Sequence, residues 1–109
     1  MKSLIIIGAS GHGKVVADIA KLNGYEEIRF LDDREDITEC GGFPVIGRSS
    51  QFEEHDCDIF VAIGNAIIRK KLIDIIEEKG KKIVTLIHPN AVIANKVNIK
   101  KILFKLLIY

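Results

Sequence analysis

The sequence predicts an α/β domain built on a doubly wound parallel sheet of about four strands, with helices on both faces. Short and almost continuous apolar runs recur along the chain, which is typical of strands buried on both faces of a parallel sheet. Segments with helical spacing alternate with these runs, and such alternation implies right-handed crossovers. A glycine-rich turn joins the first apolar run to the first helical segment.

The first half of the predicted fold is a strand, a helix and a strand. We expect the first strand at residues 3–7, where the apolar run is rich in isoleucine. Apolar residues then recur at helical spacing through residues 14–23, and Gly24 is placed to end that helix. The second strand is expected at residues 27–31, and Asp32 follows it directly.

The middle of the chain is less regular. Residues 33–42 are polar and indicate a loop. Residues 45–47 can form a short edge strand, and the capping-box pattern at residues 50–53 indicates one helical turn. The third strand is expected at residues 58–63, where the chain is again apolar.

The last predicted elements are a helix and a fourth strand at residues 83–87. Asn65 can cap the helix and Gly80 can end it. One face of this helix is expected to hold Ile68, Leu72, Ile75 and Ile76. We place the first strand between the second and third, because this order brings the turns at residues 8–13, 32–33 and 64–65 to one crevice. Ligands of such sheets bind beyond the carboxyl ends of the strands.

Composition excludes several functions. The 109 residues suit one domain, and 16 basic against 15 acidic residues give no reason to expect nucleic acid or a membrane as partner. The apolar runs are too short for a membrane span or a signal peptide. Cys40 and Cys57 lack the spacing of a zinc or redox motif, so no metal is expected, and free thiols fit a cytoplasmic protein.

The glycine turn, residues 8–13, is the expected functional centre. Gly8, Gly13 and Lys14 fit the spacing of a nucleotide-hydrolase loop, but Val15 stands where that loop needs a hydroxyl to hold magnesium. The dinucleotide fingerprint also fits, except that Ser10 replaces its middle glycine, which lowers the odds of NAD. A glycine turn before a helix can still bind phosphate through backbone N–H groups.

Other candidate residues lie near this turn in the predicted fold. His12 is favoured as a ligand contact because it stands between two glycines of the turn. Asp32 lies where dinucleotide folds place a ribose-binding acid, but a strand-end cap explains it equally well. Gly64 and Asn65 can form a helix cap or donate to a ligand. Arg69 can reach a phosphate or can be an ordinary solvated charge.

Together these stretches resemble the N-terminal domain of bacterial sugar O- and N-acetyltransferases of the NeuD/PglD type. The matching segments are residues 7–16, 30–33, 61–65 with 68–69, and 86–89 with 91–93. The resemblance implies a Rossmann-like domain that binds a nucleotide-activated sugar, typically a UDP-linked amino sugar. The substrate-binding residues that it implies are Ser10, Gly11, His12, Gly13, Asp32, Asp33, Gly64, Asn65 and Arg69.

The resemblance also implies what should follow the domain. In the family, hexapeptide repeats form a left-handed β-helix that trimerises, binds acetyl-CoA and supplies the catalytic histidine. Here we expect a sugar-nucleotide domain at residues 1–89 and the opening coil of a β-helix within residues 90–109. The chain lacks glycine after Ile99, so this coil is expected to be truncated.

A truncated member would bind a UDP-sugar without transferring acetyl groups itself. We therefore nominate no catalytic residue and expect no cofactor on this chain, with acetyl-CoA as co-substrate of an intact, homotrimeric parent. The chain itself is expected to be a monomer or a weak oligomer. Two alternatives stay open: a nicotinamide- or CoA-binding module, and a non-enzymatic remnant or assembly domain.

Overall fold

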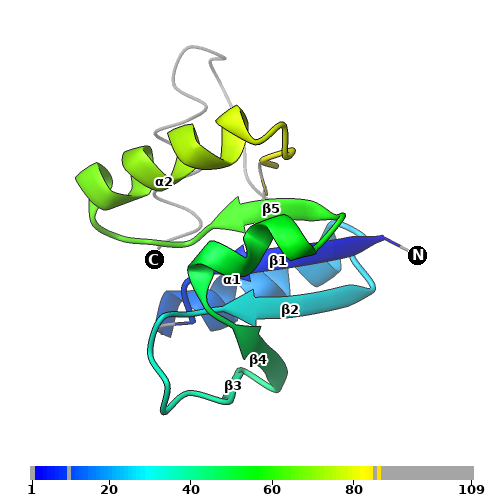
Figure 1. Ribbon diagram of the computed structural model, residues 1–109. Coiled ribbons are helices and arrows are strands. Elements are labelled where there is room, and N and C mark those ends of the chain that lie inside the picture. Colours follow the sequence, from blue (N-terminus) through cyan, green and yellow to red (C-terminus); the bar gives the residue numbers. More distant parts are fainter. Residues whose placement is uncertain (1, 10, 85, 87–109) are drawn as a thin grey trace, which may run out of the picture.

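The computed structural model describes residues 2–9, 11–84 and 86, and its centre is a five-stranded sheet with the order β3-β4-β2-β1-β5 (Figure 1). The first strand pairs in parallel with both β2 and β5, as predicted. The fourth strand pairs in parallel with β2, and β3 pairs antiparallel with β4. The strands are β1 (Ser3–Ile7), β2 (Glu27–Leu31), β3 (Glu39–Cys40), β4 (Phe43–Gly47) and β5 (Asp58–Val61).

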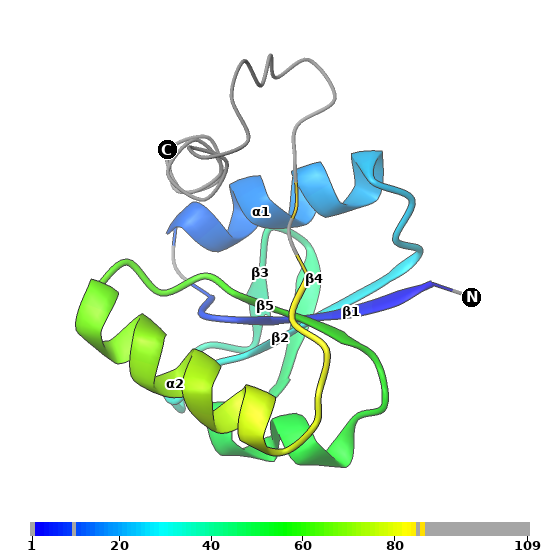
Figure 2. The same ribbon diagram turned by 90° about the horizontal axis from the view of Figure 1, so that it is seen from above.

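Helices cover both faces of this sheet, which confirms the doubly wound architecture. Figure 2 shows α1 (Gly11–Leu22) on one side, with α2 (Ala66–Glu78) and the 3-10 helix η1 (Ser49–Glu54) on the other. Among the described residues, no helix has both the length and the apolar character that a bilayer crossing requires.

The central strand β1 is buried on both faces, as its apolar run predicts. Leu4 and Ile6 are fully buried in the cluster that packs under α1. Ile5 and Ile7 point the opposite way, because successive strand side chains alternate, and are buried with Ile76 of α2. The two clusters form the core of the domain on either side of the sheet.

The edge of the sheet differs from the prediction. Residues 33–42 were expected as a loop, but β3 and β4 form a hairpin around Gly41 and Gly42. Both glycines have positive φ, at 59° and 88°. A two-residue hairpin turn of this kind requires positive φ at both central positions and therefore favours glycine. The hairpin makes the sheet mixed rather than wholly parallel.

The C-terminal part of the prediction is only partly described. Ile83 forms an isolated parallel bridge with Ile59 of β5, so the predicted fourth strand touches the sheet at its first residue. Leu86 is buried under α1. The remainder of that strand at residues 85 and 87, and the predicted β-helix coil and tail at residues 90–109, lie outside the described residues.

The apolar face predicted for α2 is wrong at two positions. Ile76 is fully buried and Leu72 packs against it, but Ile68 and Ile75 are 53% and 46% exposed. The sequence spacing places all four on one helical stripe, whereas α2 packs against β5 at one edge of the described sheet. Of these four residues, only Leu72 and Ile76 therefore pack in the cluster that contains strand residues.

Candidate functional site

The carboxyl ends of four strands meet at one edge of the sheet. Because β1, β2, β4 and β5 run parallel, the residues that follow them lie side by side: Gly8, Asp32, Arg48 and Ala62. The amide of Gly8 donates to the carbonyl oxygen of Leu31 at 2.8 Å, and the amide of Ala62 donates to that of Ile7 at 2.8 Å. The structure thus brings the three predicted turns to this edge.

The glycine turn is shorter than predicted. The helix α1 begins at Gly11 instead of Lys14, so Gly11, His12 and Gly13 form its first turn. Glycine and histidine are weak helix formers, which is why the sequence placed them in a loop, but tertiary packing overrides such preferences. Ser10 and the side chain of His12, both predicted to bind substrate, lie outside the part of the chain that the structure describes. The first backbone N–H groups of an α-helix lack partners within the helix, and α1 begins just after the carboxyl end of β1.

Two glycines allow the close approaches that shape this turn. Gly8 has φ of 111°, and a Cβ atom there would lie 2.6 Å from the carbonyl oxygen of Ala62. Gly13 has no unusual φ, but its Cβ would lie 2.8 Å from the Phe30 ring and 2.9 Å from the carbonyl oxygen of Gly8. Gly13 therefore lets α1 pack tightly on β2, in addition to any ligand contact.

Asp32 fastens the glycine turn to the end of β2. Its Oδ2 accepts a hydrogen bond from the amide of Ala9 at 2.8 Å, and its Oδ1 accepts one from the amide of Arg34 at 2.9 Å. The Arg34 side chain donates from Nε to Oδ1 at 3.1 Å and from Nη2 to Oδ2 at 3.2 Å. Arg34 Nη2 also donates to the carbonyl oxygen of Ala9 at 2.9 Å.

This hydrogen bonding sets the charge state of Asp32. Burial of the carboxyl group by itself raises the pKa of Asp32, but the hydrogen bonds from the Arg34 side chain, from the Arg34 amide and from the Ala9 amide outweigh burial. The net result is a pKa below the usual value for aspartate. Asp32 is therefore ionised throughout the physiological pH range.

Asp33 contacts a different element. The amide and hydroxyl of Ser49 both donate to Asp33 Oδ1, at 3.0 and 2.7 Å, and the hydroxyl also lies 2.9 Å from Oδ2. Asp33 thus holds the first residue of η1 beside the loop after β2. The two neighbouring carboxylates, which the sequence analysis placed in one turn, therefore have different partners: Asp32 binds Ala9 and Arg34, and Asp33 binds Ser49.

The turn after β5 is organised by its own side chains. Asn65 is the N-cap of α2, because its Oδ1 accepts from the amides of Ile67 and Ile68 at 3.0 and 3.1 Å. Arg69 Nη1 donates to the carbonyl oxygen of Ile63 at 3.2 Å and lies 3.5 Å from that of Gly64. The helix-cap alternative for Asn65 is confirmed, and Arg69 folds back on the end of β5.

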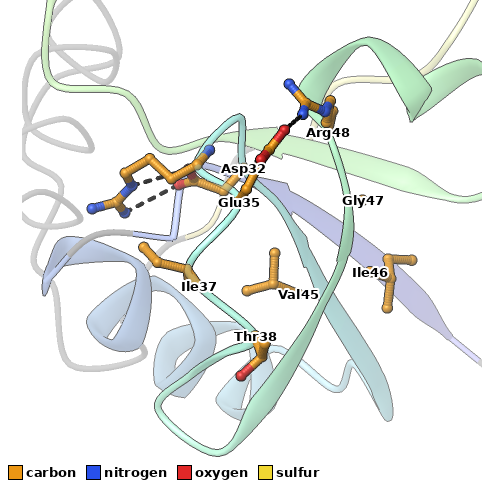
Figure 3. Close-up of a pocket in the computed structure, with 9 residues that line it drawn as sticks. Asp32, Glu35, Ile37, Thr38, Val45, Ile46, Gly47 and Arg48 are labelled. Atoms are coloured by element: carbon orange, nitrogen blue, oxygen red, sulfur yellow. Dashed lines mark hydrogen bonds and ion pairs between the residues drawn. The ribbon is translucent and has the colours of Figure 1, made fainter.

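An open pocket of about 340 Å³ adjoins Asp32 between the loop after β2 and the β3–β4 hairpin. Figure 3 shows Ile37, Thr38 and Val45 along this pocket and the Glu35–Arg48 ion pair toward one end. The residues that line it are Asp32, Arg34, Glu35, Ile37, Thr38, Val45, Ile46, Gly47 and Arg48. Its volume is within the range of small-ligand sites.

Most residues of this pocket were missed from the sequence. The segment of residues 33–42 contains no known binding motif, so Arg34 was not predicted as a site residue although it directly follows Asp32 and Asp33. The paired glycines at 41 and 42 were the available signal, because Gly-Gly between two short apolar stretches predicts a hairpin. Among the described side chains, no group of three or more His, Cys, Asp or Glu is placed to hold a metal ion.

Comparison with known proteins matches most of this domain to a protein family. Residues 3–76 match the family of PglD N-terminal domains. UDP-N-acetylbacillosamine N-acetyltransferase of Bacillus subtilis (strain 168) is 30% identical over an alignment of 102 residues, and the match covers 86% of this chain and 46% of that protein.

Solved structures give the same assignment. The acetyltransferase domain of PglB from Neisseria gonorrhoeae FA1090, in complex with acetyl coenzyme A, is 46% identical, with a TM-score of 0.72 over 82% of this chain and 45% of that one. PerB from Caulobacter crescentus, in complex with CoA and GDP-perosamine, is 31% identical, with a TM-score of 0.71 over 84% and 45%. The chain spans about half the length of each of these relatives.

Proposed function

The chain belongs to the family of PglD N-terminal domains, and from this membership we propose that it binds the nucleotide part of a UDP-linked amino sugar. In the intact protein, that sugar would receive an acetyl group from acetyl-CoA. The names of the relatives support a nucleotide-linked amino sugar, because the Bacillus subtilis protein is named for a UDP-sugar and PerB is in complex with GDP-perosamine. Residues 1–89 would form the binding domain.

One observation carries the proposal: the glycine turn and the pocket share Asp32 and Arg34. Both side chains line the pocket, and both hydrogen-bond to Ala9 of the turn. A nucleotide bound at this junction would place its nucleoside in the pocket, beside Ile37 and Val45, and its phosphates at the start of α1. Helix N-termini bind phosphate through unpaired N–H groups and the helix dipole.

The pocket suits a nucleoside better than a whole sugar nucleotide. Ile37 and Val45 are half-buried and pack against the core under α1, so they offer an apolar wall to a base. Arg48 and Glu35 at the other end are exposed and paired with each other. The sugar would then extend past the phosphates toward the turn after β5, where Gly64, Asn65 and Arg69 lie.

The hydrogen bonds of Asp32 argue against the nicotinamide alternative. Dinucleotide folds use a carboxylate at the end of the second strand to accept ribose hydroxyls. A carboxylate offers about four acceptor positions, and Asp32 accepts hydrogen bonds from four donors of Ala9 and Arg34. With Ser10 also replacing the middle glycine, the two usual determinants of NAD binding are altered.

Calorimetric titration of the chain tests the proposal. UDP-N-acetylglucosamine and UDP are expected to bind, and NAD and acetyl-CoA are expected to bind more weakly or not at all. GDP serves as a second nucleotide, because a preference for it would change the base but keep the site. Tighter binding of NAD than of UDP would refute the proposal, as would the absence of binding by every nucleotide diphosphate.

The position of the ligand can be tested in the same preparation. Amide chemical shifts are expected to change at Gly8, Ala9 and Gly11 of the turn and at Thr38 of the pocket when UDP is added. Lys70, which is exposed on α2 and paired with Asp74, supplies a reference amide that should not move. Shift changes confined to the opposite edge of the sheet would contradict the proposed site.

A further inference from the structure

Arg34 and Asp32 together hydrogen-bond to both peptide groups that flank the Cα atom of Ala9. Its Nη2 donates directly to the carbonyl oxygen of Ala9 at 2.9 Å. The other contact runs through Asp32, whose Oδ2 accepts both from Arg34 Nη2 and from the amide of Ala9. One guanidinium and one carboxylate therefore hold the chain on both sides of the residue where β1 gives way to α1.

The chemistry of this arrangement requires arginine. The planar guanidinium presents Nε and Nη2 as a fork that matches the two oxygens of a carboxylate, and Nη2 retains a second hydrogen for the Ala9 carbonyl. A lysine ammonium is a single point of charge and cannot make these three contacts from one fixed position. The guanidinium is held although the Arg34 side chain is about half exposed, at 53%.

We propose that Arg34 is a positioning residue that sets the conformation of the glycine turn, and that Asp32 acts on a bound nucleotide through this turn instead of contacting it. The four donors that surround Asp32 occupy the acceptor positions that a ribose would need. Fixing the Ala9 peptides also fixes the direction in which the chain enters α1. This role rests on the proposed function only where it concerns nucleotide binding; the positioning of the turn stands without it.

The first experiment follows the amide of Ala9 by NMR during an acid titration of the ligand-free chain. In the wild type, the Ala9 amide should report the protonation of Asp32 at a pH below that of an ordinary aspartate, because Arg34 stabilises the carboxylate. R34Q should move this midpoint upward, and D32N should abolish it. R34K should give an intermediate midpoint, since one ammonium replaces the fork.

The Glu35–Arg48 ion pair supplies a matched control. Arg48 is 55% exposed, lines the same pocket and pairs with the Glu35 carboxylate, and within the described part of the chain no hydrogen bond or ion pair joins it to Asp32 or Ala9. R48Q should therefore leave the midpoint at Ala9 unchanged. Asp36 and Cys40 are the other titratable groups with an electrostatic effect on Arg34. Any step that persists in D32N belongs to such a neighbour. An R34Q midpoint equal to that of the wild type would overturn the proposal.

The second experiment measures UDP affinity and separates the two hypotheses. R34Q and D32N should each weaken binding about tenfold, the loss that corresponds to one charge-assisted hydrogen bond. The double variant should lose no more than either single variant, because both changes release the same turn. The control K70Q on α2 should bind like the wild type.

The outcomes of the two experiments are distinct. If the wild type binds no nucleotide but the Ala9 midpoint moves in R34Q, the proposed function fails and the positioning role stands. If nucleotides bind and the losses in R34Q and D32N add, Asp32 contacts the ligand independently and the positioning role fails. A folded amide spectrum for each variant shows that the change is local.

Discussion

Replacing Gly13 by alanine separates the packing role of the glycine turn from its proposed role in binding. Gly13 lies in the first turn of α1 and is buried. An added Cβ would meet the Phe30 ring at 2.8 Å, the Gly8 carbonyl oxygen at 2.9 Å and Cys40 Sγ at 3.2 Å. The first two distances are shorter than a carbon atom tolerates. The ring can rotate a little, but the carbonyl belongs to a turn that is held by hydrogen bonds.

The expected loss of stability follows from two opposing effects. Forcing a methyl group into a packed site costs about 1–3 kcal/mol. Alanine in turn stabilises the helix by up to about 1 kcal/mol, because glycine is the weaker helix former. We therefore expect G13A to lower the free energy of unfolding by roughly 1–2 kcal/mol, which corresponds to about 4–8 °C of Tm for each kcal/mol in a domain of this size.

The matched control for this measurement is G64A. Gly64 also lies at the carboxyl edge, but an added Cβ there would have no heavy atom within 4 Å, and its φ is not positive. Alanine at such a position leaves stability unchanged or raises it by roughly 0.4–1 kcal/mol, because the unfolded chain loses freedom. Urea unfolding followed by far-UV circular dichroism measures both variants. If G13A is as stable as the wild type, helix and strand do not pack as closely as described.

Three further predictions concern the core, the helix cap and pH. I76A should lower the free energy of unfolding by about 2–5 kcal/mol, because Ile76 is fully buried. I75A should change it by less than about 0.5 kcal/mol, because Ile75 is 46% exposed. Equal losses of the two variants in urea unfolding would contradict the orientation of α2. N65A should cost about 1 kcal/mol, since it removes the cap of α2, and thermal unfolding measures it. Burial, followed by the hydrogen bond to Asp58 and the charge of that residue, raises the pKa of Tyr25. The folded chain therefore holds this proton more tightly than the unfolded chain, and stability should fall as the pH rises above about 10; Y25F should lack this alkaline loss, and an identical pH profile would refute it.

The strand order could be predicted because it follows from the chain pattern. The apolar run of β1 requires neighbours on both sides, and placing it between β2 and β5 brings the glycine turn and the two polar turns to one edge. The structure confirms this order. Periodicity could not predict β3, because its two residues are too few to show any alternation. The only sequence signal for this hairpin is the pair of glycines in its turn.

The contacts within the site could not be predicted in the same way. The candidate residues that the structure describes lie at the predicted edge of the sheet, because the ends of the strands determine their position. Their partners depend on geometry between distant segments: Asp33 pairs with Ser49, and Asp32 with Ala9. Arg34 has no signature in the sequence, because a single arginine in a polar loop is ordinarily a solvated charge. Its role follows only from the position of its guanidinium.

The central place of β1 has a consequence for how the chain is made. The strand β1 precedes the other strands of this domain in the chain, and α1 and β2 follow soon after it, so Leu4 and Ile6 can be covered early in synthesis. Ile5 and Ile7 face the other way and wait for β5, which begins about fifty residues later, a delay of roughly 3–10 s at typical rates of synthesis. During that interval, the face of β1 that holds Ile5 and Ile7 is exposed on the nascent chain, where a chaperone or another nascent chain can bind it.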